Sequence, residues 1–174
     1  MQGNLNQDLT DIRFNIAMNE RLLNSNKLVL QQLDLKVPYN DSMQYHYSNL
    51  WGNTIFVKNM SAFDNLKSLG FSIISNDALR IKITNLYSAR YEYLSKIEEG
   101  ESQVQLEIFG PLLRKHIRTD TIWGKAHPFD PKSLMNNLEF KEMIRTNVNA
   151  RQFIINIYKG LEQDVLELID AIEA

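Results

Sequence analysis

Apolar side chains, with two asparagines among them, recur at alternating steps of four and three residues along the first part of the chain. The positions are Leu5, Leu9, Ile12, Ile16, Asn19, Leu23, Asn26, Leu30 and Leu33. Residues at this spacing share one face of a helix and form the seam of a coiled coil. The pattern predicts a long helix that begins with Asn4 as its cap. It ends before Pro38, because the residue preceding a proline is pushed out of the helical region.

A second helical pattern runs from Leu79 to Leu112. Ser75, Asn76 or Asp77 can cap its start, since a side-chain oxygen there accepts a hydrogen bond from the first turn. Gly110-Pro111 lies near its end, and a proline inside a helix removes a backbone donor and clashes with the preceding turn. We therefore predict helix on both sides of a kink at this point.

The last helical pattern runs from Phe140 to Ile172, with Asn147 and Arg151 as polar positions on its apolar face. Before it, Asp130-Pro131 predicts the start of a short helix, because a capping carboxylate is followed by a proline at the first helical position. Residues Thr119 to Asp130 show no helical spacing and are predicted to form a loop.

Long helices with one apolar face must bury that face against one another. Residues 38–74 interrupt the long patterns and predict short helices. The sequence therefore predicts an all-α fold, an elongated bundle of three or four long helices with short helices capping one end. Because 174 residues are the size of one domain, we expect a single helical-bundle domain over residues 1–174.

Composition excludes several classes of protein. The formal charge of −2 argues against a nucleic-acid-binding protein, which is normally basic. The chain has no cysteine, so disulfides, thiolate metal sites and a cysteine nucleophile are excluded. Its longest apolar runs, such as Phe153–Ile155, are far shorter than the about 20 residues that span a bilayer.

The chain contains no motif of a known catalytic or cofactor site. It has no glycine-rich phosphate loop, and no Glu-x-x-His pair of the kind that binds iron in helical bundles. His46, His116 and His127 lie in three different segments, without a carboxylate at ligand spacing. Glu98 and Glu101 fall in an acidic run that is typical of a solvated helix face. We therefore expect no metal, no cofactor and no enzymatic activity.

The run Arg114-Lys115-His116-Ile117-Arg118 is basic. Two interpretations apply to it. It can bind an anion or an acidic partner, or it can place positive charge near the end of a helix, where the macrodipole favours cations. The second interpretation needs no ligand and is the one that the sequence favours.

Asn19 and Asn26 occupy positions of the first helix where apolar residues belong, one heptad apart. A polar residue on a helix seam lowers stability but fixes the register and the choice of partner. The two asparagines therefore predict either the seam of a homodimer or a hydrated part of the bundle, and the sequence does not choose between these interpretations.

Aromatic side chains gather outside the long helices, at Tyr39, Tyr45, Tyr47, Trp51, Phe56, Phe63, Phe71, Trp123 and Phe129. If they cover one end of the bundle, they either fill it as core or enclose a small ligand. The ligand interpretation predicts a pocket of at least about 300 Å³ that is lined by Tyr45, Trp51 and Trp123.

Residues 66–87, LKSLGFSIISNDALRIKITNLY, carry an "IsNd-LR-I--lY" pattern. In this pattern, and more weakly in Leu138-Glu139-Phe140 and residues 165–173, the chain resembles a family of uncharacterised bacterial single-pass membrane proteins with a helical extracytoplasmic domain. The resemblance implies a transmembrane helix upstream of Met1 that has been removed, and a location on the extracytoplasmic side of the inner membrane. A cytoplasmic location stays open, and no catalytic residue is implied.

Within this motif, Asn76, Arg80 and Tyr87 allow two interpretations. Asn76 can start a helix, Arg80 can bond back to the preceding connection, and Tyr87 can face the core at helical spacing. Alternatively, the three side chains bind a ligand. The structural interpretation requires nothing beyond the chain itself.

Two functional hypotheses follow. The first is a non-enzymatic, membrane-tethered helical domain that acts through contacts with a protein partner or with its own copy. The second is a sensor domain in which the aromatic cap closes on a small molecule. An enzyme with a site of unremarkable polar residues is a third and more distant alternative.

Overall fold

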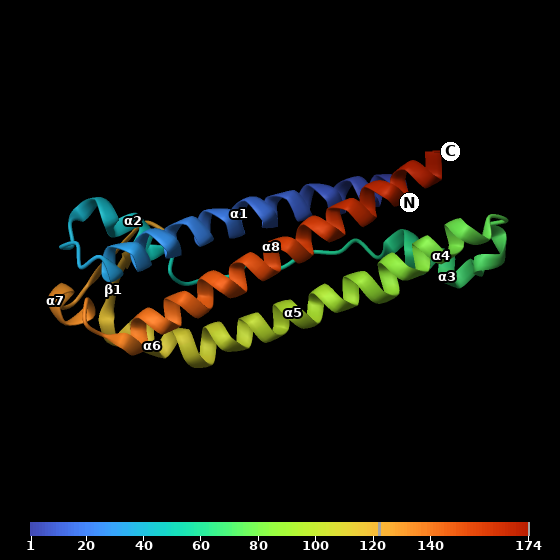
Figure 1. The fold of residues 1–174 in the computed structure, drawn as a ribbon. Helices are drawn as coiled ribbons and strands as arrows, with labels where there is room; N and C mark the ends of the chain where they lie inside the picture. The colour runs from blue at the N-terminus through green and yellow to red at the C-terminus, as the bar shows by residue number, and fades with distance from the viewer. Residues whose placement is uncertain (122, 174) are drawn as a thin grey trace. The chain divides into compact units, whose positions relative to one another are not determined.

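A computed structural model describes residues 1–121 and 123–173 of the chain. The structure is 77% helical and 5% strand, which confirms the all-α class. The α-helices, drawn in Figure 1, are α1 (Gln2–Asp34), α2 (Gln44–Ser48), α3 (Ser61–Leu69), α4 (Asp77–Asn85), α5 (Tyr91–Val104), α6 (Gly110–His116), α7 (Pro131–Leu134) and α8 (Leu138–Glu173). Short 3₁₀ turns are η1 (Asp41–Met43) and η2 (Phe71–Ile73).

The first and last helical patterns form the two long helices that their spacing predicts. Helix α1 has 33 residues and α8 has 36 residues. Asn4 is not the cap of α1, because the helix already begins at Gln2. Its side chain instead donates hydrogen bonds to Asn59 Oδ1 at 2.8 Å and to Ser61 Oγ at 2.7 Å.

The middle pattern forms one helical run that changes its winding twice. Two π-helical turns, η3 (Leu86–Arg90) and η4 (Gln105–Phe109), separate α4, α5 and α6. At the end of η4 the Gly110 N–H donates to the Gln105 carbonyl, five residues back. The expected break at Gly110-Pro111 therefore takes the form of a widened helical turn. Such a turn tolerates the missing backbone N–H of Pro111.

Residues 119–130 are not a loop throughout, which corrects the sequence-based prediction. Strands β1 (Ile117–Thr121) and β2 (Lys125–Pro128) pair as an antiparallel hairpin with Arg118 opposite His127. Strands of this length show too few alternations for the period of two to be recognised in the sequence. Asp130 accepts hydrogen bonds from the first backbone N–H groups of α7, as its position before Pro131 predicts.

The chain divides into two compact units. Unit 1 comprises Met1–Ala17, Ile55–Glu98 and Ile155–Ala174, and unit 2 comprises Met18–Thr54 and Glu99–Ile154. Helices α1 and α8 contribute residues to both units. The single domain over residues 1–174 stays a prediction.

Unit 1 contains an extended segment, residues 55–60, whose backbone is bound by carboxylates of α1. The Val57 N–H donates to Asp11 Oδ2 at 2.9 Å, and the Asn59 N–H donates to Asp8 Oδ1 at 2.8 Å. Alternate residues of an extended chain face the same side, and residues three apart lie on one face of a helix. The spacing of the two aspartates therefore matches the spacing of the two donors.

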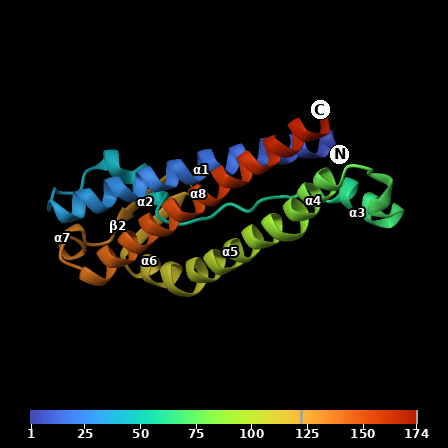
Figure 2. The same ribbon diagram turned by 45° about the vertical axis from the view of Figure 1, so that its right-hand side comes forward.

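The core of unit 1 is aromatic. The ring of Tyr87 is stacked on that of Phe63, with centroids 4.7 Å apart, and the ring of Tyr91 contacts Tyr87 and Phe56 edge-on. Figures 1 and 2 both show α3 beside α4, which brings Phe63 and Tyr87 together.

Unit 2 has an aliphatic and aromatic core drawn from α1, α2, α6, the hairpin, α7 and α8. Its fully buried members include Val29, Leu50, Ala126, Phe140 and Ile144. In both views α2, the hairpin and α7 lie close together (Figures 1 and 2). No helix in the described part of the chain combines the length and the apolarity needed to cross a lipid bilayer.

Candidate functional site

Unit 2 contains a cavity of about 830 Å³. Its walls come from the segment after α2, from η4 and α6, and from the hairpin. The larger side chains that line it are Tyr47, Trp51, Leu106, Leu113, Arg114, Ile117, Arg118, Trp123 and Phe129. This volume lies within the range of about 300–1,000 Å³ that is typical of small-molecule sites.

Two glycines let the aromatic walls of the cavity approach the backbone. Gly52 has a φ of +113°, and a Cβ at this position would lie 2.3 Å from Cη2 of Trp123. A Cβ at Gly110 would lie 3.6 Å from Cζ2 of Trp51 and 3.2 Å from Nη1 of Arg114. Any side chain at Gly52 would therefore displace the Trp123 ring and strain the backbone.

Trp123 itself adopts a left-handed backbone conformation, with a φ of +61°. This conformation is unfavourable for a bulky residue and persists only where the surrounding structure enforces it. Here it places the indole on the Gly52 backbone, at the wall of the cavity. Such strained residues are found more often at ligand-binding positions than elsewhere in proteins.

The charged groups of the cavity wall are cationic. The Arg114 guanidinium lies over the Trp51 ring, 5.9 Å from its centroid. Arg118, also on the wall, forms an ion pair with Asp120 at 2.9 Å, and Asp120 is 3.4 Å from Nδ1 of His127. None of the described residues that line the cavity is an aspartate or a glutamate.

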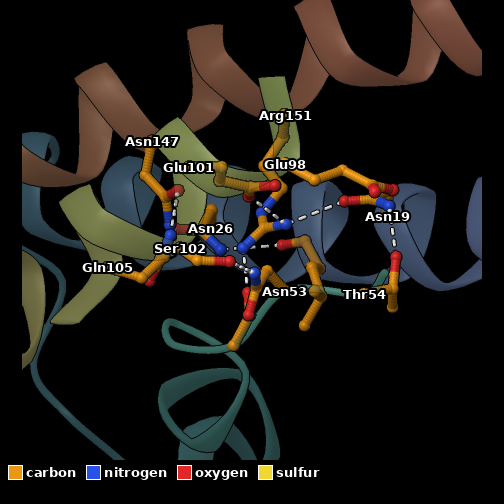
Figure 3. A network of polar contacts seen from close by, with 12 residues as sticks. Asn19, Asn26, Asn53, Thr54, Glu98, Glu101, Ser102, Gln105, Asn147 and Arg151 are labelled. Carbon is orange, nitrogen blue, oxygen red and sulfur yellow. Dashed lines mark hydrogen bonds and ion pairs between the residues drawn. The ribbon is translucent and has the colours of Figure 1, made fainter. Parts of the chain in front are cut away.

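A buried polar network, shown in Figure 3, is hydrogen-bonded to Gly52 and Asn53 of the cavity wall. Its centre is Arg151 of α8, whose side chain is 1% exposed. Nη1 of Arg151 is 2.7 Å from Glu101 Oε1 and donates to Asn19 Oδ1 at 2.7 Å, while Nη2 donates to the Gly52 carbonyl. Because Gly52 also lines the cavity, the backbone of the wall is held directly by Arg151.

Amide side chains extend this network along α8 and α1. Asn147 donates to Asn26 Oδ1 at 3.0 Å and to the Leu50 carbonyl at 3.1 Å, and it accepts from Gln105 Nε2 at 3.1 Å. Gln105 belongs to the π turn η4, so the widened turn supplies a residue to the network. A second contact with the wall is made by Asn53, which donates to Ser102 Oγ at 2.6 Å.

Burial makes the charged forms of both Arg151 and Glu101 less favourable. Loss of hydration raises the pKa of Glu101 although Arg151 acts in the opposite direction, and it lowers the pKa of Arg151. Desolvation therefore outweighs the attraction between the charges, as is common for buried pairs. The pair is close but poorly aligned, because neither carboxylate oxygen of Glu101 has a hydrogen-bond donor among the described residues.

The network thus buries more hydrogen-bonding capacity than it satisfies. Within the described part of the chain, Nε of Arg151, Oε1 of Gln105 and Oδ1 of Asn49 also lack a partner. A buried polar atom without a protein partner is costly, and strain, an ordered water or a functional role can account for it. In this region, therefore, unit 2 buries polar side chains instead of packing apolar ones.

Of the residues predicted from the sequence to bind a ligand, Trp51 and Trp123 lie in one cavity. Tyr45 does not line it, because its ring is directed to the Arg21 guanidinium, 5.0 Å from the ring centroid. The sequence singled out the basic run as a possible anion site, and the structure places Arg114 and Arg118 of that run on the same cavity wall.

Asn76, Arg80 and Tyr87 belong to unit 1 and have structural contacts. Asn76 caps α4 by accepting from the Leu79 N–H at 3.1 Å. Arg80 donates to the Ile74 carbonyl at 2.9 Å, and Tyr87 is buried in the aromatic core. These contacts favour the structural interpretation of the 66–87 motif, and the three residues do not join Trp51 and Trp123 in a site.

Two sequence-based interpretations of polar residues change. Asn19 and Asn26 are 0% and 1% exposed and bond within unit 2, so their burial gives no support to a homodimer seam. Glu98 and Glu101 are not on a solvated helix face. Glu98 is buried and accepts from the Phe56 N–H at 2.9 Å, whereas Glu101 meets Arg151.

Comparison with protein-family models, curated proteins and solved structures found no match. The resemblance of residues 66–87 to a membrane-protein family therefore stays a prediction, and the functional interpretation depends on the cavity and its polar surroundings.

Proposed function

We propose that unit 2 is a small-molecule-binding module whose ligand occupies the aromatic cavity. The observation that supports this proposal most directly is the cavity of about 830 Å³ with Trp51, Trp123 and Phe129 on its walls. Small-molecule sites are concave, mostly apolar and supplied with a few polar groups, and this cavity has all three properties.

This proposal favours the sensor hypothesis over action through protein contacts. The protein-contact hypothesis relied on Asn19 and Asn26 as a seam, and both side chains are buried and bonded within the chain. The proposal is binding rather than catalysis, because the described cavity wall contains neither a carboxylate nor a histidine that could exchange a proton with a ligand.

The polar network offers a route from the cavity to the helices of unit 2. Gly52 and Asn53 of the wall bond to Arg151 of α8 and Ser102 of α5, and Arg151 bonds in turn to Asn19 of α1. A ligand that shifts the backbone at Gly52 changes the hydrogen bonds of all three helices. We therefore propose a sensor, in which occupancy of the cavity alters helix packing within unit 2.

Three further parts of the proposal depend on the sequence alone. They are the assembly of the helices into an elongated bundle, a membrane tether upstream of Met1, and a location on the extracytoplasmic side of the inner membrane. Helical spacing supports the first, and the resemblance of residues 66–87 supports the other two.

A neutral apolar fluorophore tests the proposal. N-phenyl-1-naphthylamine fluoresces when it leaves water, so its titration into the protein reports occupancy of an apolar cavity. We expect saturable binding with one site per chain. Trp51→Ala removes one aromatic wall and should weaken binding about five- to tenfold. Trp123→Ala, on the hairpin, should have an effect of similar size.

Phe153→Ala is the matched control, because Phe153 is an aromatic residue of unit 2 that is 50% exposed and does not line the cavity. It should leave the affinity unchanged. Circular dichroism would establish that all variants keep their helices. Binding that is not saturable, or that Phe153→Ala weakens as much as Trp51→Ala, would reject the cavity as the site.

A further inference from the structure

The cavity wall has positive charge that no group of the wall neutralises. Arg114 and Arg118 line it, and no acidic residue does so in the described chain. Building on the proposed function, we infer that the ligand is an amphipathic anion, with an apolar or aromatic body and one carboxylate, phosphate or sulfonate group that Arg114 binds.

Arg114 is the arginine that is available to a ligand. The structure gives it no carboxylate partner among the described residues, whereas Arg118 is paired with Asp120. Its guanidinium is held against the Trp51 ring, and Gly110 leaves space for this contact. A guanidinium over an aromatic ring can still donate hydrogen bonds through its in-plane N–H groups, and these match the geometry of a carboxylate or phosphate.

The rest of the wall selects the body of the ligand. Trp51, Trp123 and Phe129 supply aromatic surface, and Leu106 and Leu113 add aliphatic surface. Flat, apolar groups bury well against such side chains. A small inorganic anion would leave most of this surface unfilled, and an uncharged hydrocarbon would leave Arg114 without a partner.

The charges around Arg114 support an anion rather than a cation. Its neighbours on α6 are Lys115 and His116, and Arg118 follows at the start of β1. Asp120 of the hairpin is a carboxylate that already contacts Arg118 and His127. A cationic ligand would therefore be repelled by the wall, and an anionic one attracted.

Two fluorophores with the same ring system separate charge from apolar fit. 8-Anilino-1-naphthalenesulfonate is N-phenyl-1-naphthylamine with an added sulfonate. We expect the sulfonate compound to bind about five- to tenfold more tightly than the neutral one at low salt. Because Arg114 is exposed to solvent, the difference should shrink as the salt concentration rises.

Arg114→Met keeps most of the apolar length of the side chain and removes its charge. It should abolish the preference for the sulfonate compound over the neutral compound. Lys115→Met is the matched control, because it removes the same charge from the next residue of α6, which does not line the cavity. It should keep the preference.

The outcomes separate this inference from the proposed function. If both compounds bind equally to the unmodified protein, or if Lys115→Met abolishes the preference as Arg114→Met does, the anion inference is wrong and the cavity remains a site. If neither compound binds, the proposed function and the anion inference are both wrong.

Discussion

The two units bury carboxylates in different ways. In unit 1, Asp8 accepts hydrogen bonds from the Tyr91 hydroxyl at 2.7 Å and from the Asn59 N–H at 2.8 Å. Both donors are uncharged and each oxygen has a partner. In unit 2, Glu101 faces the Arg151 guanidinium, and its oxygens lack a hydrogen-bond donor among the described residues.

The difference lies in how completely the buried polar groups are paired. Asp8 accepts the hydrogen bond of the Asn59 N–H in the extended segment 55–60, and a backbone N–H that is shielded from water needs such a partner. The Arg151–Glu101 pair holds the backbone of a cavity wall and leaves polar atoms unsatisfied. A fully satisfied polar network makes a core rigid, whereas a buried polar group without a partner is costly.

Arg151→Met should have the largest effect on stability. It leaves Glu101 buried without its cation, and it removes the donors to Asn19 and to the Gly52 carbonyl. We expect the free energy of unfolding, measured by urea denaturation, to fall by about 3–5 kcal/mol.

A second variant distinguishes the buried charge from the lost packing. In Glu101→Met with Arg151→Met both charges are absent, and desolvation no longer opposes folding. This double variant should be more stable than Arg151→Met alone. A loss below about 1 kcal/mol in Arg151→Met would contradict the central place of this pair in unit 2.

Asp8→Asn should have a smaller effect, in unit 1. The asparagine oxygen can still accept from Tyr91 or from Asn59, but its amide group then faces the other donor. We expect a loss of about 1–3 kcal/mol in the same denaturation experiment. Asp170→Asn, at an exposed position of α8 in unit 1, is the control and should change stability by less than about 0.5 kcal/mol. Equal losses in the two variants would show that Asp8 does not hold the extended segment.

The smallest expected effect is the pH dependence that His46 of unit 2 contributes to stability. Burial lowers the pKa of His46 from 6.5, and Nδ1 of its ring is 3.2 Å from Ser25 Oγ. As the pH falls through 6.5, His46 takes up protons in the unfolded chain before it does so in the folded chain. Stability therefore falls as the pH is lowered through 6.5.

His46→Gln should remove this part of the pH dependence. The difference in unfolding free energy between the unmodified protein and the variant, followed from pH about 8 to about 5, isolates His46 from the carboxylates. We expect the unmodified protein to lose unfolding free energy relative to His46→Gln as the pH falls. A difference that stays constant across this range would show that His46 is not buried enough to matter.

Much of the secondary structure could be predicted from local sequence. The spacing of Leu5 to Leu33 and of Phe140 to Ile172 predicted α1 and α8, and Asp130 was predicted to cap α7. These features depend on residues within a few positions of one another. The hairpin was missed because its strands are short and only pairing with each other defines them.

The candidate site could be predicted only in part. The aromatic composition pointed to Trp51 and Trp123, whereas for the basic run that contains Arg114 the sequence favoured a role at the end of a helix. The sequence by itself determined which side chains are apolar, aromatic or charged, and which segments are helical. Only the tertiary structure decided that Arg151 meets Glu101 and the Gly52 carbonyl, and that Trp123 covers Gly52. A charged residue on a helix has the same neighbours in the sequence whether water or another helix surrounds its side chain. Its burial and its partner are therefore decided only when the chain packs.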